Sequence, residues 1–323
     1  MITRRKILMG SMVAGASAIL PSRFLMAKAS QPSTPVNFAV PSGACDCHTH
    51  IFGDPQQFPW FSGRTYTPES ASVAEMRALH RALHMDRVVI VNPSVYGTDN
   101  SCTLDAMKQL GPRSRGIAVI DDKTPAGQLD EMERAGVRGI RLNFENFGQT
   151  NPRVAQKAFQ SAVERVAGRK WHIQIYTRLA VIESLHTEIM AAPIPVVFDH
   201  FGGANASLGP AQPGFETMLD LVRSGKAYVK ISGAYRSSDK PPDYPDVAPL
   251  AKALIAANAE RIVWGSDWPH PAGAALPGHS ATDIAPLFQI DDGRLLNQLT
   301  VWAPDAGMRK MILVDNPTRL YGF

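Results

Sequence analysis

CDCHTHI, residues 45–51, is the first of a series of short runs with the length and apolar content of buried strands. Seven more follow along the chain: DRVVIVNPS at 86–94, SRGIAVID at 114–121, VRGIRLNF at 137–144, WHIQIYT at 171–177, PVVFDHF at 195–201, AYVKISG at 227–233 and RIVWGSD at 261–267. β-Branched residues dominate most of these runs, as is typical of β-strands that are covered on both faces. The sequence therefore predicts eight strands.

The segments between these runs have the pattern of crossover helices. In 71–84, 125–136 and 244–259, apolar residues recur three and four positions apart, and Gly, Pro or Asn stands near the ends. Eight strand and helix units in roughly 290 residues predict an α/β fold, a single (β/α)8 TIM barrel with one core. We expect this barrel to occupy residues 45–323.

Polar side chains stand toward the ends of the expected strands. Because catalytic groups of such barrels stand at the C-terminal ends of different strands, these side chains should converge at one mouth. Three histidines, two arginines and an aspartate at one rim indicate a functional site rather than a set of bonds to loop backbone. The whole set comprises His48, His50, Ser94, Arg141, His172, Gln174, Tyr176, Asp199, His200, Ser232, Tyr235, Arg236 and Asp267.

Several chemistries lack their sequence signals. The chain contains no G-x-S-x-G elbow, no G-x-G-x-x-G after the first strand and no G-x-x-x-x-G-K-[ST] loop, which argues against serine hydrolases, dinucleotide enzymes and P-loop proteins. Hydrolysis by activated water remains. An aspartate can take a proton from water while imidazoles donate to a carbonyl oxygen that becomes negative in the transition state.

The first 29 residues have the features of a twin-arginine export signal. Arg4 and Arg5 precede an apolar run at 7–20, and Ala27-Lys28-Ala29 offers an A-x-A cleavage site. We therefore expect a periplasmic protein in which the Pro- and Ser-rich residues 30–44 lead onto the barrel. The apolar run is too short to span a bilayer, so we expect no membrane association after cleavage.

Charge and cysteine content argue against a nucleic-acid-binding protein and against a disulfide-stabilised fold. Removing the signal leaves 28 basic and 29 acidic residues, so the mature chain is nearly neutral and offers no basic surface for nucleic acid. Cys45, Cys47 and Cys102 do not support a disulfide framework, and we expect them to be small buried residues. Alternation along the first strand should place both histidines of CDCHTHI on one face and both cysteines on the other.

Several motifs together resemble the amidohydrolase superfamily. HTH at 48–50, DHFG at 199–202 and VWGSDWPH at 263–270 are similar to its strand-end motifs. NPSVYGTDN, RGIRLNF, WHIQIYT, VKISGAYR and the closing NPTRLYGF resemble its 2-pyrone-4,6-dicarboxylate lactonase group. The resemblance runs from about residue 43 to the C-terminus and touches every expected strand except one, the strand at 114–121.

This resemblance implies a lactonase that acts on a small anionic lactone. In it, Asp267 activates the water and three histidines polarise the lactone carbonyl: His48, His50 and His200. The acidic substituents of the lactone are held by Arg141, Arg236, Ser94, Tyr66 and Tyr176. Arginine suits that role because its planar fork matches carboxylate or sulfonate oxygens with paired hydrogen bonds.

Two departures from the family pattern affect the expected cofactor and substrate. Binuclear members carry a bridging Lys or Glu on strand four, whereas this strand ends in RLNF, so we do not expect a binuclear centre. Lactonases of this group resemble metal-free enzymes, and no cofactor is favoured; a mononuclear zinc would have His48, His50, His200 and Asp267 as ligands. The pyrone dicarboxylate lactonases also have another arginine shortly after strand four, where this chain has Glu145-Asn146-Phe147. A sulfonated muconolactone or an aldaric-acid lactone is therefore as good a candidate substrate as pyrone dicarboxylate.

Two other functions compete with the lactonase. A periplasmic binder of organic anions would use the same arginines, but it gains nothing from Asp267 in its pocket. The second alternative, among enzymes, is a metal-dependent decarboxylase of the same superfamily. Metal analysis and product identification separate the decarboxylase from a lactonase.

Overall fold

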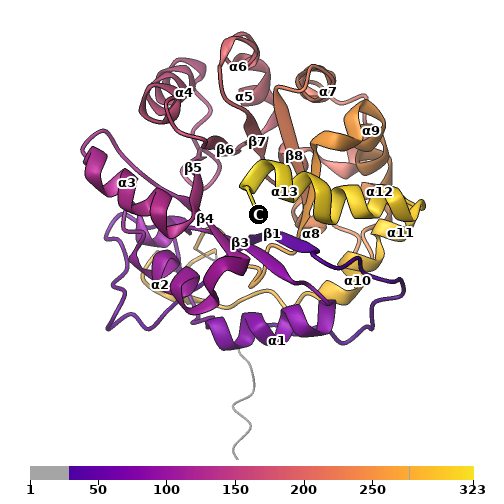
Figure 1. Cartoon of the computed structure of the whole chain (residues 1–323), viewed down its shortest axis with the longest axis horizontal. Coiled ribbons are helices and arrows are strands. Elements are labelled where there is room, and N and C mark those ends of the chain that lie inside the picture. Colours follow the sequence, from indigo (N-terminus) through magenta and orange to yellow (C-terminus); the bar gives the residue numbers. More distant parts are fainter. Residues whose placement is uncertain (1–28, 276) are drawn as a thin grey trace, which may run out of the picture.

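The centre of the computed structural model, which describes residues 29–275 and 277–323, is a sheet of eight parallel strands. Each strand pairs with the next one along the chain, and helices surround the ring that they form (Figure 1). The strands are β1 (Cys45–Thr49), β3 (Arg87–Val91), β4 (Ser114–Ala118), β5 (Val137–Asn143), β6 (His172–Tyr176), β7 (Val196–Phe198), β8 (Ala227–Ser232) and β9 (Ile262–Gly265). Residues 1–28 of the predicted export signal lie outside the described residues.

Backbone hydrogen bonds between β1 and the segment after β9 bring the two edges of the sheet together. The amide of His50 donates to the carbonyl of Trp268 at 2.8 Å, and the amide of Asp267 donates to the carbonyl of His48 at 2.9 Å. Thr49 and Trp268 also form a parallel bridge. The sheet is therefore a nearly closed barrel, and the predicted (β/α)8 fold is confirmed.

The crossover helices begin and end at signals that the sequence carries. At the start of α1, the Ser72 side chain accepts from the Glu75 amide while the Glu75 carboxylate accepts from the Ser72 amide, which is a capping box. Helix α3 ends at Gly136, whose φ of +104° favours glycine. The helices are α1 (Val73–Leu83), α2 (Ser101–Leu110), α3 (Ala126–Ala135), α4 (Pro152–Val166), α5 (Leu179–Ser184), α6 (His186–Ala191), α7 (Phe215–Arg223), α8 (Ala234–Ser237), α9 (Ala248–Asn258), α10 (Asp292–Asn297), α11 (Leu299–Trp302), α12 (Ala306–Lys310) and α13 (Asn316–Tyr321).

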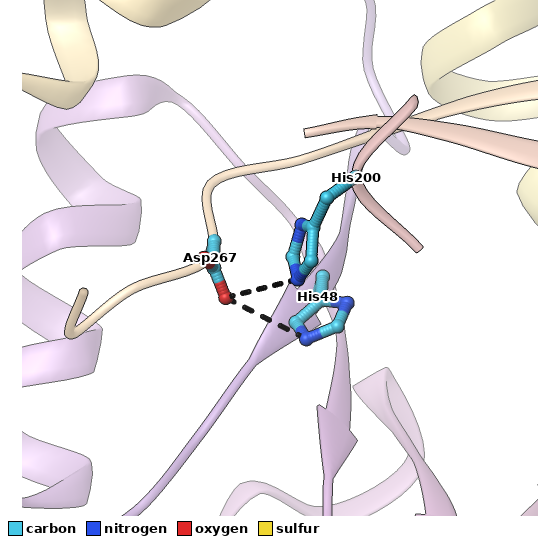
Figure 2. A group of neighbouring side chains, drawn as sticks. All are labelled: His48, His200 and Asp267. Carbon is cyan, nitrogen blue, oxygen red and sulfur yellow. Dashed lines mark ion pairs between the residues drawn. The ribbon is translucent and has the colours of Figure 1, made fainter. Parts of the chain in front are cut away.

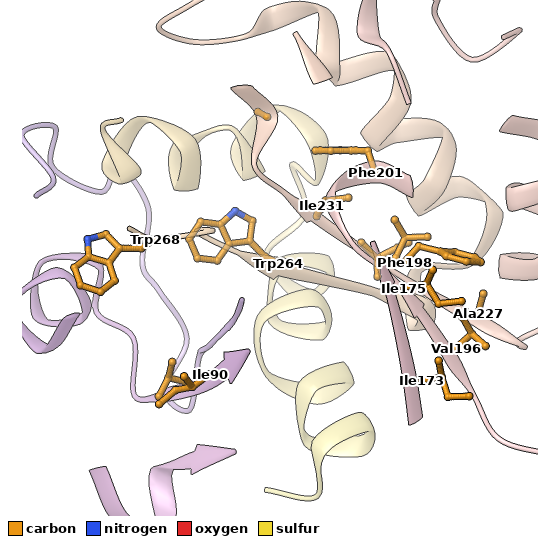
Figure 3. Close-up of a cluster of buried hydrophobic side chains, with 14 of the residues drawn as sticks. Ile90, Ile173, Ile175, Val196, Phe198, Phe201, Ala227, Ile231, Trp264 and Trp268 are labelled. Atoms are coloured by element: carbon orange, nitrogen blue, oxygen red, sulfur yellow. The ribbon is translucent and has the colours of Figure 1, made fainter. Parts of the chain in front are cut away.

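Side chains of the strands alternate between two hydrophobic clusters. The larger cluster packs the strands against the helices and includes the buried residues drawn in Figure 3, among them Ile173, Ile175, Val196, Phe198, Ile231 and Trp264. The smaller cluster is formed by the intervening strand positions, which face the inside of the barrel, such as Val89, Val91, Val197 and Val263. This alternation explains why the strands read as almost continuous apolar runs.

One expectation about the first strand is wrong. Cys45 and Cys47 belong to the inner cluster, yet the side chain of His48 also contacts residues inside the barrel. The cause is a shift in the register of β1 against β3 between Asp46 and Thr49, which interrupts the regular alternation of side chains. The cysteines are free and buried, as predicted.

The C-terminal residues close the N-terminal end of the barrel. Tyr321 is fully buried in the inner cluster, and the C-terminus lies over the centre of the ring in Figure 1. The guanidinium groups of Arg87 and Arg115 lie 4.9 and 4.6 Å from the centre of the Phe323 ring. The predicted mouth lies at the opposite end, where the strands finish.

Residues 30–44 pack along the segment that follows β9. The hydroxyls of Ser33 and Thr34 donate to the Asp291 carboxylate at 2.7 and 2.6 Å, and Trp268 Nε1 donates to the carbonyl of Ser30 at 3.0 Å. A short parallel pair of strands, β2 (Thr67–Pro68) and β10 (Ile284–Ala285), holds the loop that carries Tyr66 against the same region. No helix of 29–275 and 277–323 has the length and apolar character that crossing a bilayer requires.

Candidate active site

The ends of three strands bring three buried ionisable groups together. His48 lies near the end of β1, His200 follows β7, and Asp267 follows β9. Figure 2 shows the carboxylate of Asp267 directed at both imidazoles. Its Oδ1 lies 3.6 Å from His48 Nε2, 3.6 Å from His200 Nε2 and 3.8 Å from the Nε2 of His50. All four side chains predicted to be catalytic are therefore next to one another.

The two oxygens of Asp267 have different surroundings. Oδ2 accepts from the hydroxyl of Tyr235 at 2.6 Å and from Nε of Arg236 at 2.5 Å. Oδ1 is buried, and no described residue donates a hydrogen bond to it. Burial raises the pKa of this carboxyl, but the Arg236 guanidinium and the imidazoles outweigh that effect and hold the pKa well below its usual range. Asp267 thus presents an ionised oxygen with open lone pairs to the imidazoles.

The histidines are uncharged at neutral pH. Burial is the main cause that lowers the pKa of His50 to about 3 and of His200 to about 4, and it also lowers the pKa of His48 well below its usual value. His50 Nδ1 donates to the carbonyl of Val91 at 2.8 Å, so its Nε2 is unprotonated. His200 Nδ1 lies 2.9 Å from the hydroxyl of Ser232.

The backbone at two of these residues adopts a conformation that L side chains seldom take. His200 has φ +48° and Asp267 has φ +67°. Between them, just after β8, a Cβ at Gly233 would lie 3.0 Å from His200 Nδ1 and 3.2 Å from Asp267 Oδ2, so a side chain there would require these groups to shift. The turn after β8 thus packs closely against both catalytic candidates.

The two predicted substrate-binding arginines reach the site, and each is held by a carboxylate. Arg141 Nε and Nη2 lie 3.1 and 3.0 Å from Oδ2 of the buried Asp199. Arg236 contacts Asp267 and also donates to the carbonyl of Pro271 at 2.9 Å. These contacts fix the guanidinium groups before a ligand binds and use only part of their donors.

The other predicted contacts line the same mouth. Ser94 follows β3, and its hydroxyl accepts a hydrogen bond from Asn146 Nδ2 at 3.0 Å; Tyr66 is almost fully buried. The ring of Tyr176 lies 5.1 Å from the guanidinium carbon of Arg141 and 5.1 Å from the ring of His200. The structure therefore brings together the nine residues that were predicted to act in catalysis or substrate binding.

Two cavities flank these residues. One, of about 250 Å³, is lined by Tyr176, His200 and Arg236, with the ion pair of Arg178 and Glu145 at its edge. The other, of about 330 Å³, is lined by Ser94 and Arg141 and by the exposed rings of Phe61 and Phe147. A small molecule placed between the arginines would meet a polar wall on one side and an aromatic wall on the other.

The donor set also fits a metal ion. His48, His200 and Asp267 each offer a ligand atom, and these atoms lie within 4.8 Å of one another. Ligands about 2.0 to 2.1 Å from a tetrahedral zinc lie roughly 3.4 Å apart, close to the separations of 3.3 to 3.8 Å among the facing atoms of His48, His50 and Asp267. The described residues therefore contain a candidate metal site at the same position.

Sequence reasoning missed a charged residue below the histidines. Lys230 lies in the middle of β8 and is fully buried, within 3.4 Å of Asp199 Oδ1 and 3.3 Å of His48 Nδ1. Its signal was present, because Tyr228, Lys230 and Ser232 alternate on one face of a buried strand. A lysine on the inner face of such a strand needs a partner.

One predicted member of the rim lies elsewhere. His172 begins β6, at the opposite end of the barrel from the mouth, and its ring packs edge-on against Tyr321 at 5.4 Å. Neither of its nitrogens has a hydrogen-bond partner among the described residues. It is therefore part of the closed end and not of the site.

Comparison with known proteins agrees with this geometry. The family model described as Amidohydrolase matches residues 45–323. A 4-sulfomuconolactone hydrolase of Rhizobium radiobacter is 36% identical over 90% of this chain and 93% of its own, and a 2-pyrone-4,6-dicarboxylate hydrolase of Comamonas testosteroni is 33% identical over 90% and 93%. A crystal structure of a candidate 2-pyrone-4,6-dicarboxylic acid hydrolase from Pseudomonas putida is similar with a TM-score of 0.73, at 31% identity over 88% of this chain and 98% of its own. The family match spans the whole barrel and its site, and the chain belongs to the amidohydrolase family.

Proposed function

We propose that this protein is a lactonase, a hydrolase that opens the ester bond of a small anionic lactone in aromatic-compound or sugar-acid catabolism. The observation that carries the proposal is the ionised Oδ1 of Asp267, which has no donor among the described residues and faces three neutral imidazoles. Two arginines stand beside it, as an anionic substrate requires. Relatives named for 2-pyrone-4,6-dicarboxylate and 4-sulfomuconolactone support this substrate class.

The geometry suits attack by water on the lactone carbonyl. A water beside Asp267 Oδ1 gives its proton to that oxygen as its own oxygen bonds to the carbonyl carbon. N–H groups of His48 and His200 stabilise the negative charge on the carbonyl oxygen, because His50 Nε2 is unprotonated and cannot donate. The bond from that carbon to the ring oxygen then breaks, and the proton passes from Asp267 to the ring oxygen, which becomes a hydroxyl group. The new carboxylic acid releases its remaining proton to solvent and becomes a carboxylate.

The hydrolysis needs no metal in this proposal. Asp267 is already ionised and the imidazoles already supply donors, so both roles are filled by protein groups. A zinc held by His48, His200 and Asp267 would supply Lewis-acid activation of the carbonyl or the water.

A panel of lactones tests the function and the metal together. Acid release is measured for carboxylated, sulfonated and uncharged lactones after exhaustive chelation and after addition of zinc. We expect hydrolysis of the anionic lactones only, at a rate that chelation leaves essentially unchanged. Loss of activity that zinc restores would contradict the metal-free mechanism. Binding without acid release would favour an anion binder, and release of carbon dioxide would favour a decarboxylase.

We propose that the protein acts in the periplasm, on the basis of Arg4, Arg5 and the A-x-A site. Replacing both arginines by lysine, Arg4→Lys/Arg5→Lys, should reduce its recovery in the periplasmic fraction and leave the precursor in the cytoplasm. Cell fractionation with a protein specific to each compartment as a control measures this. Equal periplasmic recovery of both forms would contradict export by the twin-arginine route.

A further inference from the structure

Two phenylalanine side chains are exposed at the wall of the cavity beside Arg141. Phe61 is 44% exposed and Phe147 is 52% exposed, and both line the cavity of about 330 Å³ that Ser94 and Arg141 also line. This volume lies within the range of small-molecule sites, about 300 to 1,000 Å³. Water covers aromatic surface here, and a ligand with an apolar part would displace that water favourably. The proposed hydrolysis gives these rings no role.

Backbone contacts hold Phe61 at the cavity. Its amide donates to the carbonyl of Val95 at 2.8 Å, and its carbonyl accepts from the amide and the guanidinium of Arg64 at 3.2 and 3.1 Å. The ring covers Gly97, where a Cβ would lie 3.0 Å from Cγ of Phe61. The ring therefore packs on the turn that follows Ser94, and it needs no ligand to hold it there.

Phe147 lies in a turn that hydrogen bonds attach to two strand ends. The amide of Phe144 donates to the carbonyl of Tyr176 at 2.9 Å, and Nδ2 of Asn146 donates to Oγ of Ser94 at 3.0 Å. The turn thus joins the end of β6 to the segment after β3. Both phenylalanines are carried by anchored backbone before a ligand binds, which lowers the entropy that binding costs.

The charged groups of the cavity distinguish its two ends. Arg141 and Asp121 are the two charged residues that line it. Arg141 is buried, whereas Asp121 is exposed and accepts from the amide of Lys123 and the hydroxyl of Thr124. An anionic group of a ligand is attracted to Arg141 and repelled by Asp121. The anion therefore belongs at Arg141, and the part of the ligand toward the rim has to be uncharged.

The buried amide of the lining is already occupied. Nδ2 of Asn92 donates to the carbonyls of Gly97 and Asp99 at 3.3 and 3.1 Å, and its Oδ1 accepts from the hydroxyl of Thr103 at 2.8 Å. Asn92 therefore supports the turn on which Phe61 packs and has no donor left for a polar ligand group.

We propose that Phe61 and Phe147 form a subsite for a flat aromatic group, so that the preferred substrate is an anionic lactone with an aryl substituent. Arg141 holds a carboxylate of this substrate, and the aryl ring packs against the two phenylalanines in the offset or edge-on arrangements that aromatic rings favour. The choice of a lactone rests on the proposed function. The choice of an aromatic group does not, because it follows from the lining of the cavity.

Binding of two matched dicarboxylates tests the aromatic subsite without hydrolysis. Phenylsuccinate and cyclohexylsuccinate carry the same charge, but the first has a flat aromatic ring and the second a puckered saturated one. We expect isothermal titration calorimetry to give phenylsuccinate a Kd about threefold to tenfold lower, the usual gain from an aromatic pair. In Phe61→Leu/Phe147→Leu, which keeps apolar bulk without flat rings, the ratio of the two Kd values should fall to about one.

Phe288→Leu is the matched control, because Phe288 is 41% exposed and lines neither cavity at the mouth. The ratio of Kd values in this control should equal that of the unmodified protein. Equal affinities for the two dicarboxylates in the unmodified protein, or no binding of phenylsuccinate, would overturn the aromatic subsite. An unchanged ratio in Phe61→Leu/Phe147→Leu, or an equal fall in the control, would do the same.

Two lactones extend the test to hydrolysis. Phenylparaconate and methylparaconate are γ-butyrolactones with one carboxylate, and they differ in a phenyl or a methyl group. We expect kcat/KM to be about tenfold higher for phenylparaconate, chiefly through KM, and Phe61→Leu/Phe147→Leu to lose this preference. Preferential binding of phenylsuccinate without hydrolysis of either lactone would contradict the lactonase and support the subsite. Hydrolysis of both lactones with equal kcat/KM would support the lactonase and overturn the preference for an aryl group.

Discussion

Asp267→Asn is expected to lower kcat by about 10²- to 10⁴-fold, the usual contribution of a general base. Asparagine keeps the shape of the side chain and can still accept from Tyr235, but it cannot take a proton from water. The affinity for a lactone should change little, because the arginines and tyrosines that hold the substrate remain. Steady-state kinetics on the best lactone of the panel, together with the Kd of a slowly hydrolysed analogue, measure both effects.

Asp292→Asn is the matched control for this prediction. Asp292 is equally buried and contacts His270 Nε2 at 3.0 Å, but it lines neither cavity at the mouth. The kcat of Asp292→Asn should stay close to that of the unmodified enzyme. Near-normal turnover in Asp267→Asn, or an equal loss in both variants, would contradict the assignment of Asp267 as the base.

Arg141→Met is expected to lower the free energy of unfolding by about 3 kcal/mol, in addition to weakening the binding of a doubly anionic lactone. The sequence alone suggested binding as its main role. In the structure Arg141 is 6% exposed and pairs with the fully buried Asp199, so its loss leaves a buried carboxylate without one of its charged partners. Lys230 and Gln174 still contact Asp199, which keeps the loss near the lower end for a broken buried pair. Urea denaturation measures it.

Arg178→Met is the control for burial. Arg178 also pairs with a carboxylate, that of Glu145 at 2.6 Å, but its side chain is 70% exposed. An exposed pair of this kind contributes at most about 1 kcal/mol. If the two variants lost similar free energies of unfolding, the pair of Arg141 and Asp199 would not have the structural role described for it.

The barrel and most of its rim could be predicted because they depend on local pattern. Eight apolar runs separated by helical segments specify a parallel barrel, and such a barrel places the ends of its strands at one mouth. His48, His50, His200 and Asp267 follow from that rule and from the motifs around them. The same holds for Ser94, Arg141 and Tyr176, which lie at or near the C-terminal ends of their strands.

The partners of these residues could not be predicted, because they come from distant parts of the chain. That Arg141 pairs with Asp199 and Arg236 with Asp267 depends on the positions of side chains across the barrel. The irregular register of β1 places Cys47 and His48 inside together, which strict alternation does not allow.

Lys230 and His172 occupy positions in their strands that determine their depth in the barrel. Both lie on inner faces of strands, and a count along each strand from its start separates the layers of the barrel. His172 is the first residue of β6 and belongs to the closed end, while Lys230 is the fourth of six in β8 and lies below the mouth. The position of each residue along its strand can be counted in the sequence. No motif, however, marks a lysine in the middle of a strand as part of a site.

A single-turnover hydrolysis in H₂¹⁸O tests whether Asp267 directs water to the carbonyl carbon of an anionic lactone. Mass spectrometry of the fragmented product locates the label. We expect one ¹⁸O atom in the new carboxylate and none in the new hydroxyl group. Label in the hydroxyl group would show cleavage at the other carbon of the ring ester, and conversion of the lactone without incorporation of label would show a reaction other than hydrolysis.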